Sequence, residues 1–190
     1  MRSAAATLFP VADMKQTKRI SISALCIALG VVFLYLGSLL DVLDMSAAVL
    51  ASVLVLFCVL ELGYGYAGMV YLGVSVLALL LLPNKSPAIL FIGLFGYVPI
   101  SKFFFEKKMK KWAWFPKVIV FNLLFGAIVY FGAELMGFYT ENIWGIPAFV
   151  FYIVYFVFAN IVYILCDILF ARLSLLYFYR FRDRIHKYLK

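Results

Sequence analysis

Charged residues are scarce in this chain, and their scarcity excludes an ordinary water-soluble domain. Only 14% of the 190 residues are Asp, Glu, Lys or Arg and 67% are hydrophobic, whereas about a quarter of a soluble domain is charged. The apolar residues fall in runs of about 20, the length that a helix needs to cross the hydrocarbon core of a bilayer. None of these runs shows the strict apolar–polar alternation of membrane barrel strands. The sequence therefore predicts an all-α integral membrane protein.

The residue types that build metal and catalytic sites are few and scattered. The single histidine, His186, lies in a basic segment, and Cys26, Cys58 and Cys166 lie in separate apolar runs. We interpret these cysteines as small core residues, because no Cys-x-x-Cys pair or ligand cluster accompanies them. The sequence also lacks a glycine-rich phosphate loop with Lys and Ser/Thr. We therefore expect no enzymatic activity, no cofactor and no metal.

One segment, Gly63–Gly68, matches the spacing G-x-G-x-x-G that nucleotide-binding folds use. That function requires a preceding strand and a helix that begins under the pyrophosphate. Here apolar runs of transmembrane length flank the motif on both sides. We therefore expect a tight turn between two helices.

The breaks between apolar runs predict six transmembrane helices in a compact bundle, with residues 1–190 forming a single membrane domain. Prolines 83 and 87 bound a loop, and Pro99 predicts a kink in the fourth span. Residues 1–14 are expected to be a flexible extension, because the segment Met-Lys-Gln-Thr-Lys-Arg that begins at Met14 resembles the natural start of a bacterial protein. Residues 177–190 are expected to be a basic cytoplasmic tail. The predicted spans are about 20–40, 47–62, 67–82, 88–105, 115–136 and 146–173.

The basic residues fix the expected orientation. Six spans place sixteen of the seventeen lysines and arginines on one side of the membrane and leave Lys85 alone on the other. Positive residues near span ends accumulate on the cytoplasmic side, so both termini are expected in the cytoplasm of a bacterial cell with the chain in its inner membrane. The formal net charge of +8 then reflects orientation in the lipid bilayer, and we expect no nucleic-acid partner.

The fifth and sixth spans each carry a polar face. Polar groups are costly in lipid, so these faces should point into the bundle or a cavity. They either line a cleft for a small polar ligand or hydrogen-bond the helices to one another, and the spacing leaves both open. The face of the sixth span comprises Tyr152, Tyr155, Phe156, Ala159, Asn160, Tyr163 and Asp167, and that of the fifth comprises Asn122, Gly126, Tyr130 and Ala133. With outer-loop residues added, the candidate ligand contacts are Asn84, Tyr130, Glu134, Tyr152, Tyr155 and Asn160.

Two carboxylates, Glu61 and Asp167, lie near the cytoplasmic ends of their spans. Two such groups at one level do not make a proton path through the membrane. We expect them to pair with basic residues at that interface, for example Asp167 with Arg172 or Lys117.

The first span carries Ala24 and Ala28, four residues apart on one helical face. Small residues at this spacing let two membrane helices approach closely. The approach is either to the protein's own bundle or to a helix of another subunit.

Together with the basic start at Lys15–Arg19 and about six spans in under 200 residues, this segment resembles the substrate-binding S component of ECF-type vitamin transporters. The resemblance implies that Ala24 and Ala28 dock a transmembrane coupling subunit that works with separate ATPases. It also implies that the later spans and outer loops hold a vitamin-like ligand for uptake. The sequence lacks the family's vitamin-specific motifs, and the basic tail is unusual for it. The alternative is an MreD-like membrane scaffold that recruits cytoplasmic or membrane partners.

Overall fold

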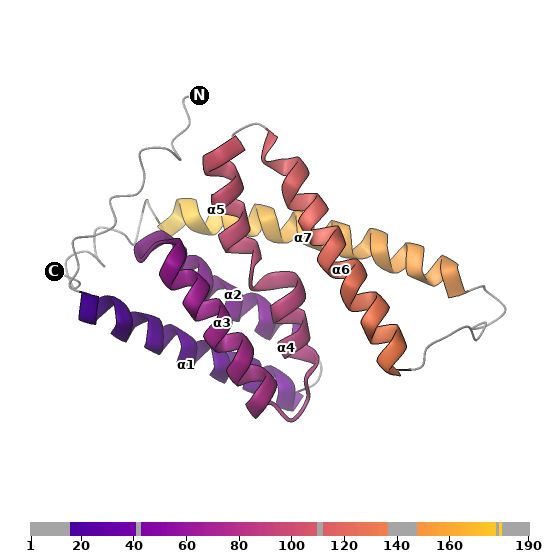
Figure 1. The fold of residues 1–190 in the computed structure, drawn as a ribbon, viewed down its shortest axis with the longest axis horizontal. Helices are drawn as coiled ribbons and strands as arrows, with labels where there is room; N and C mark the ends of the chain where they lie inside the picture. Colours follow the sequence, from indigo (N-terminus) through magenta and orange to yellow (C-terminus); the bar gives the residue numbers. More distant parts are fainter. Residues whose placement is uncertain (1–15, 41–42, 110–111, 137–147, 178, 180–190) are drawn as a thin grey trace.

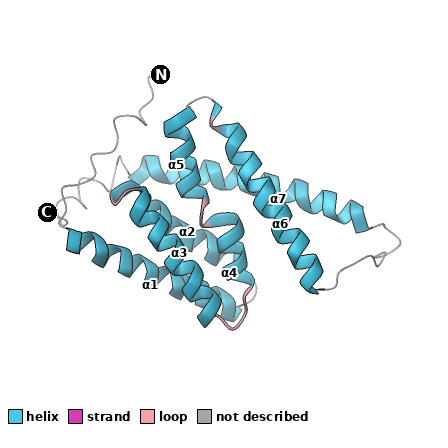
Figure 2. Ribbon diagram, viewed as in Figure 1, coloured by secondary structure: helices cyan, strands magenta, loops and turns pink. Residues whose placement is uncertain are grey.

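The structure is a computed structural model that describes residues 16–40, 43–109, 112–136, 148–177 and 179. Side chains within these ranges are described except at 109, 130–136, 148–152 and 155. Throughout the described ranges the regular elements are helices, and no strand occurs among them (Figure 2). This confirms the predicted all-α class. The elements are α1 (Gln16–Leu40), α2 (Asp44–Glu61), α3 (Tyr64–Leu81), α4 (Ser86–Leu90), η2 (Phe91–Phe95), α5 (Val98–Met109), α6 (Trp114–Met136) and α7 (Ala148–Leu176).

Five helical stretches of the described chain are long and apolar enough to cross a membrane. They are Gln16–Leu40, Asp44–Glu61, Tyr64–Leu81, Ser86–Lys108 and Phe156–Leu176, and α6 adds the shorter apolar stretch Trp114–Val129. The helices begin and end within a few residues of the predicted spans, as expected where hydropathy alone sets the boundaries.

The first three helices pack against one another as successive antiparallel neighbours (Figure 1). Gly37 on α1 allows the closest approach, because a methyl group there would overlap the Cβ of Ala47 on α2. The turn between α2 and α3 is short: α2 ends at Glu61 and α3 begins at Tyr64, so most of the glycine motif Gly63–Gly68 lies within α3. Gly63 alone has a positive φ, of 90°, which glycine adopts without strain, and α3 begins at the next residue.

The fourth predicted span is one apolar stretch broken in the middle. After the short α-helix α4, the backbone widens into the π-helical turn η2. The α-helical conformation then returns with α5, which begins at Val98. Pro99 explains the break, because a proline ring removes one helical hydrogen bond and clashes with the carbonyl four residues earlier, here at Phe95. The Tyr71 hydroxyl donates a hydrogen bond of 2.8 Å to the carbonyl of Ile92 in η2. The predicted kink is therefore confirmed, with its centre before the proline.

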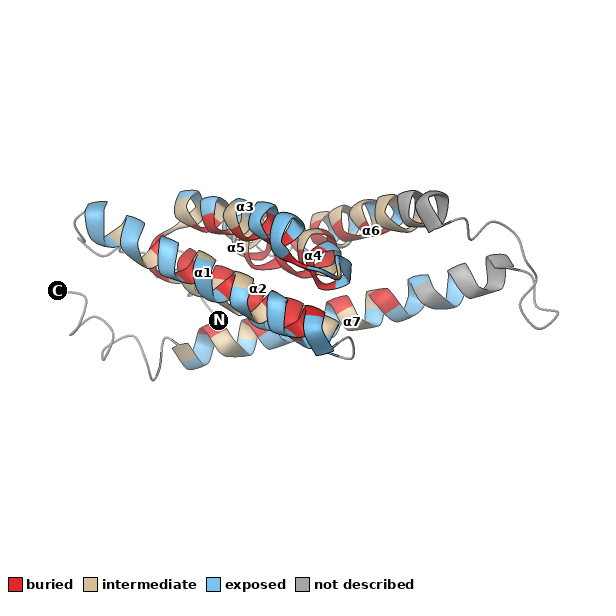
Figure 3. Ribbon diagram, turned by 90° about the horizontal axis from the view of Figure 1, so that it is seen from below, coloured by how far each residue is buried: buried red, intermediate tan, exposed pale blue. Residues whose placement is uncertain are grey.

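The last two helices lie differently from the first three. Seen in Figure 3, α6 and α7 form two neighbouring layers, with α6 above α7. The buried residues of α7 form a narrow stripe along one side of the helix. The other described faces of α7 are largely exposed and apolar, as a helix facing lipid requires. Among the α7 side chains that the structure describes, the buried ones are Ala159, Tyr163, Cys166, Phe170 and Ser174.

Candidate functional site

The side chains of α6 and α7 meet in an antiparallel ladder. Moving along α6 from its first turn, each rung lies one turn earlier on α7, and the four rungs are charged, aromatic, amide and aromatic in that order. The charged rung lies nearest the start of α6. The four pairs are Lys117–Asp167 at 3.6 Å, Phe121–Tyr163 with ring centroids 4.2 Å apart, Asn122–Asn160 at 2.8 Å and Phe125–Phe156 with centroids 5.9 Å apart.

The amide rung joins the two polar faces that the sequence predicted. The Asn160 side chain donates to Oδ1 of Asn122 at 2.8 Å and to the carbonyl of Phe156 at 2.9 Å. Asn122 in turn donates to the carbonyl of Val118 at 2.9 Å. Asn160 therefore lies between helices as predicted, and its hydrogen bonds bind α6 to α7.

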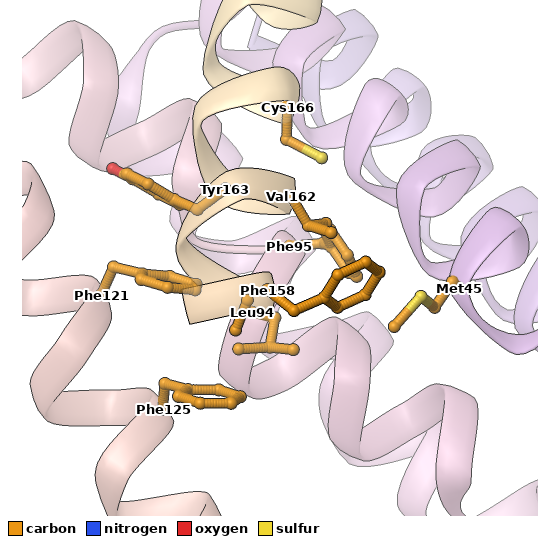
Figure 4. Close-up of a pocket in the computed structure, with 10 residues that line it drawn as sticks. Met45, Leu94, Phe95, Phe121, Phe125, Phe158, Val162, Tyr163 and Cys166 are labelled. Atoms are coloured by element: carbon orange, nitrogen blue, oxygen red, sulfur yellow. The ribbon is translucent and has the colours of Figure 1, made fainter. Parts of the chain in front are cut away.

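An aromatic cleft lies beside this ladder, between α2, η2, α6 and α7 (Figure 4). It encloses about 400 Å³ of space, including its open mouth. Its walls are buried and apolar, whereas Met45 and Phe158, which are 42% and 54% exposed, lie at the edge. The residues that line it are Met45, Leu94, Phe95, Phe121, Phe125, Phe158, Ala159, Val162, Tyr163 and Cys166.

The cleft has a defined position along the bundle. Met45 lies in the first turn of α2, at the end where α3 leads into α4. Away from that end, the rings of Tyr163, Phe121 and Phe125 stack in a column, with only 8° between the planes of the two phenylalanines. Face-to-face rings of this kind are a rigid apolar surface on which a flat ring packs well.

Two hydroxyl groups near the column have no hydrogen-bond partner among the described residues. They belong to Tyr97 on the turn before α5 and to Tyr163 on α7. In Figure 4 the Tyr163 hydroxyl points away from Met45 and the mouth. A buried hydroxyl without a partner costs about 1–3 kcal/mol, and a water molecule beside these two hydroxyls would offset that cost.

Beyond Tyr163, four charged side chains close a ring between α5, α6 and α7. Lys102 lies 2.9 Å from Asp167 and 3.4 Å from Glu106, while Lys117 lies 2.7 Å from Glu106 and 3.6 Å from Asp167. Both lysine side chains are only 4% exposed. Two positive and two negative groups alternate, so the ring is neutral as a whole. Buried charges need such complete pairing.

The ring confirms one of the two partners expected for Asp167. Lys117 is a partner, but the closest cation is Lys102, and Arg172 is exposed on another face of α7. From the sequence, Lys102 was counted among the cytoplasmic lysines, because Lys102 precedes Lys107 and Lys108 by little more than one helical turn. Its i,i+4 relation to Glu106 was the available signal for an internal pair.

The other carboxylate, Glu61, is buried and bonds to a tyrosine hydroxyl from the far end of the chain. Its side chain is 4% exposed, and it accepts a hydrogen bond from the hydroxyl of Tyr177 just beyond α7. Phe57 packs edge-on against the Tyr177 ring at 5.8 Å. The end of α7 is therefore held against the end of α2.

The remaining predicted contacts are only partly described. Asn84 accepts a hydrogen bond from the backbone of Ser86 at the start of α4 and does not line the cleft. The side chains of Tyr130, Glu134, Tyr152 and Tyr155 lie outside the described residues. Of the residues that line the cleft, Ala159 and Tyr163 belong to the polar face predicted for the sixth span. The phenylalanines and Leu94 were missed, because phenylalanine and leucine in an apolar span carry no sign of which face they occupy.

The docking candidates Ala24 and Ala28 are both exposed on α1. The neighbouring residues Ser23, Cys26 and Gly30 are buried and lie on the face of α1 that packs against the bundle. The alanine face is therefore directed away from the protein's own core.

Comparison of the chain with models of known protein families, with characterised proteins and with solved structures finds no match. The functional argument therefore depends on the residues of the site.

Proposed function

We propose that this chain is the membrane-embedded substrate-binding subunit of a small-molecule uptake system in a bacterial inner membrane. It has six spans, with α6 as the fifth and both termini in the cytoplasm. The cleft between η2, α6 and α7 carries this proposal, since buried aromatic walls with an open mouth are typical of ligand sites. The cleft lies in the later spans, where the resemblance to S components implies the ligand.

The lining narrows the class of ligand. Among the described lining residues, only Tyr163 and Cys166 bear a polar atom other than the sulfur of Met45. A stack of phenylalanine and tyrosine rings favours a ligand with a flat apolar ring or chain over the small polar ligand expected from the sequence. The ligand proposed here has an aromatic or aliphatic body that packs against these rings.

The exposed alanine face supplies the partner surface. Exposed small residues allow a second transmembrane helix to approach α1 closely. The partner is a membrane coupling subunit that carries the force of separate ATPases to this chain. Enlarging the face should block that contact without disturbing the core, because Ala24 and Ala28 are both exposed.

The proposal is tested on the full tagged chain, extracted in mild detergent from its own host and analysed by native mass spectrometry. We expect a bound small molecule, lost on Phe158→Ala at the mouth and retained on Leu165→Ala, a 61% exposed position of the same helix. We also expect co-purifying ATPases, lost on the double change Ala24→Leu and Ala28→Leu. The matched control is Leu29→Phe, an exposed enlargement on another face of α1. Wild-type protein that carries neither ligand nor ATPases rejects the proposal.

One observation favours the alternative scaffold. Both side-chain donors of the predicted ligand contact Asn160 bond within the protein, to Asn122 and to the α7 backbone, as a packing role requires. A scaffold would co-purify with envelope-assembly proteins, and Phe158→Ala would change none of its partners. The same experiment therefore separates the two functions.

A further inference from the structure

The lysines around the α5–α6 connection divide into two groups. Lys102 and Lys117 are buried and neutralised by Glu106 and Asp167. Lys107 and Lys108, in the last turn of α5, are exposed and have no carboxylate within 4.0 Å among the described residues. The inner charges are therefore matched within the protein, whereas the outer ones are accessible to an anion from outside.

Exposed aromatic rings lie next to these outer lysines in the chain. At the start of α6, Trp112 is 68% exposed, Trp114 is 54% exposed and Phe115 is 57% exposed. Trp112 stacks on Phe115 with ring centroids 5.7 Å apart, so the rings support one another rather than packing into the core. Together with Lys107 and Lys108 they make up what we call the α5–α6 corner.

The corner lies at the boundary of the hydrocarbon. The apolar stretch that could cross the membrane ends at Lys108, so the two lysines lie at the level of the lipid headgroups. Tryptophan concentrates at this depth because its ring is apolar and its N–H is polar. Lys107 is also held 5.9 Å above the ring of Tyr64 on α3, which fixes its direction.

We propose that the α5–α6 corner is a binding site for an anionic phospholipid, with Lys107 and Lys108 on the phosphate and Trp112 beside the glycerol backbone. Charge complementarity selects an anion, and the exposed rings at the headgroup level select a lipid over an acidic protein. A soluble acidic partner would leave Trp112, Trp114 and Phe115 without an apolar contact. This site is separate from the cleft and does not depend on its function.

The test uses the purified full chain in detergent, titrated with phosphatidylglycerol or with phosphatidylcholine of the same acyl chains and followed by native mass spectrometry. We expect phosphatidylglycerol to bind more tightly. Each lysine near an anionic surface contributes about fivefold, so the double change Lys107→Gln and Lys108→Gln should weaken binding about thirtyfold. Lys85→Gln, a change at the opposite end of the bundle, should leave binding unchanged.

Two further variants keep the outcome unambiguous. Replacing both lysines by arginine should preserve phosphatidylglycerol binding, because the charge remains. Trp112→Ala should weaken both lipids, because the ring contributes without regard to headgroup charge. Equal binding of the two lipids by the wild type overturns the proposal. So does unchanged phosphatidylglycerol binding by the glutamine variant.

Discussion

Lys102 on α5 donates to Asp167 on α7 twice, through its side-chain carboxylate at 2.9 Å and through its backbone carbonyl at 2.9 Å. The two residues are 65 positions apart in the sequence. This contact fixes α7 against the broken fourth helix, which α7 otherwise contacts little. Asp167 follows Tyr163 by one turn, so the same contact also positions the inner wall of the cleft.

Replacing Lys102 by methionine should lower the free energy of unfolding by about 2–3 kcal/mol. The loss arises because the Asp167 carboxylate keeps only its more distant cation, Lys117, and removing one member of a buried pair is strongly destabilising. The measurement is denaturant titration in mixed detergent micelles. Lys108→Met, an exposed change on the same helix, should change the free energy of unfolding by less than about 0.5 kcal/mol.

Combining Lys102→Met with Asp167→Asn should recover part of this stability. The double change leaves Glu106 and Lys117 as a neutral pair at 2.7 Å, and a neutral site tolerates apolar replacement far better than an unpaired charge. If the double variant loses as much as the two single variants added together, the ring is not a coupled unit.

Close packing at Gly37 gives a second prediction. Gly37→Ala should destabilise the protein by about 1–3 kcal/mol, since Ala47 has no flexible side chain with which to move aside and α1 must shift from α2. Gly126→Ala on α6 is the matched control, because a methyl group there meets nothing within 4 Å. Alanine also has the higher helix propensity, by up to about 1 kcal/mol. Thermal unfolding in detergent should separate the two variants in opposite directions.

The hydrogen bond at the broken helix gives a third prediction. Tyr71→Phe removes the donor to the Ile92 carbonyl in η2, and we expect a loss of about 1 kcal/mol in unfolding free energy. Tyr35→Phe, which changes a 42% exposed ring on α1, should have no effect. Equal stability of both variants would mean that the π-helical turn is satisfied without Tyr71.

The sequence predicted those features that depend on local patterns. Helix class and approximate ends follow from the lengths of the apolar runs, and the break in the fourth span follows from Pro99. Asn160 was assigned to the interior because an amide is costly in lipid, and it indeed contacts Asn122. In each case a single residue type or spacing carries the physical cause.

The cleft could not be predicted in this way. In a soluble protein, apolar residues mark the core, but in a membrane helix they face both lipid and protein. Hydropathy therefore cannot distinguish Phe121, which is 2% exposed, from Leu123, which is 69% exposed one half-turn away. The Lys102–Asp167 contact was missed for a different reason, since a lysine near a span end satisfies the orientation rule wherever its amine points.

The amide rung gives the last prediction, and it separates packing from ligand contact at Asn160. A double-mutant cycle with Asn122→Ala and Asn160→Ala should yield a coupling energy of about 0.6 kcal/mol and at most about 1.7, the range for hydrogen bonds between membrane helices. Since both donors of Asn160 are already engaged, neither change should release a ligand bound in the cleft. Zero coupling together with loss of the ligand would instead place Asn160 in the binding site, and the ladder between α6 and α7 would then depend on its aromatic and charged rungs alone.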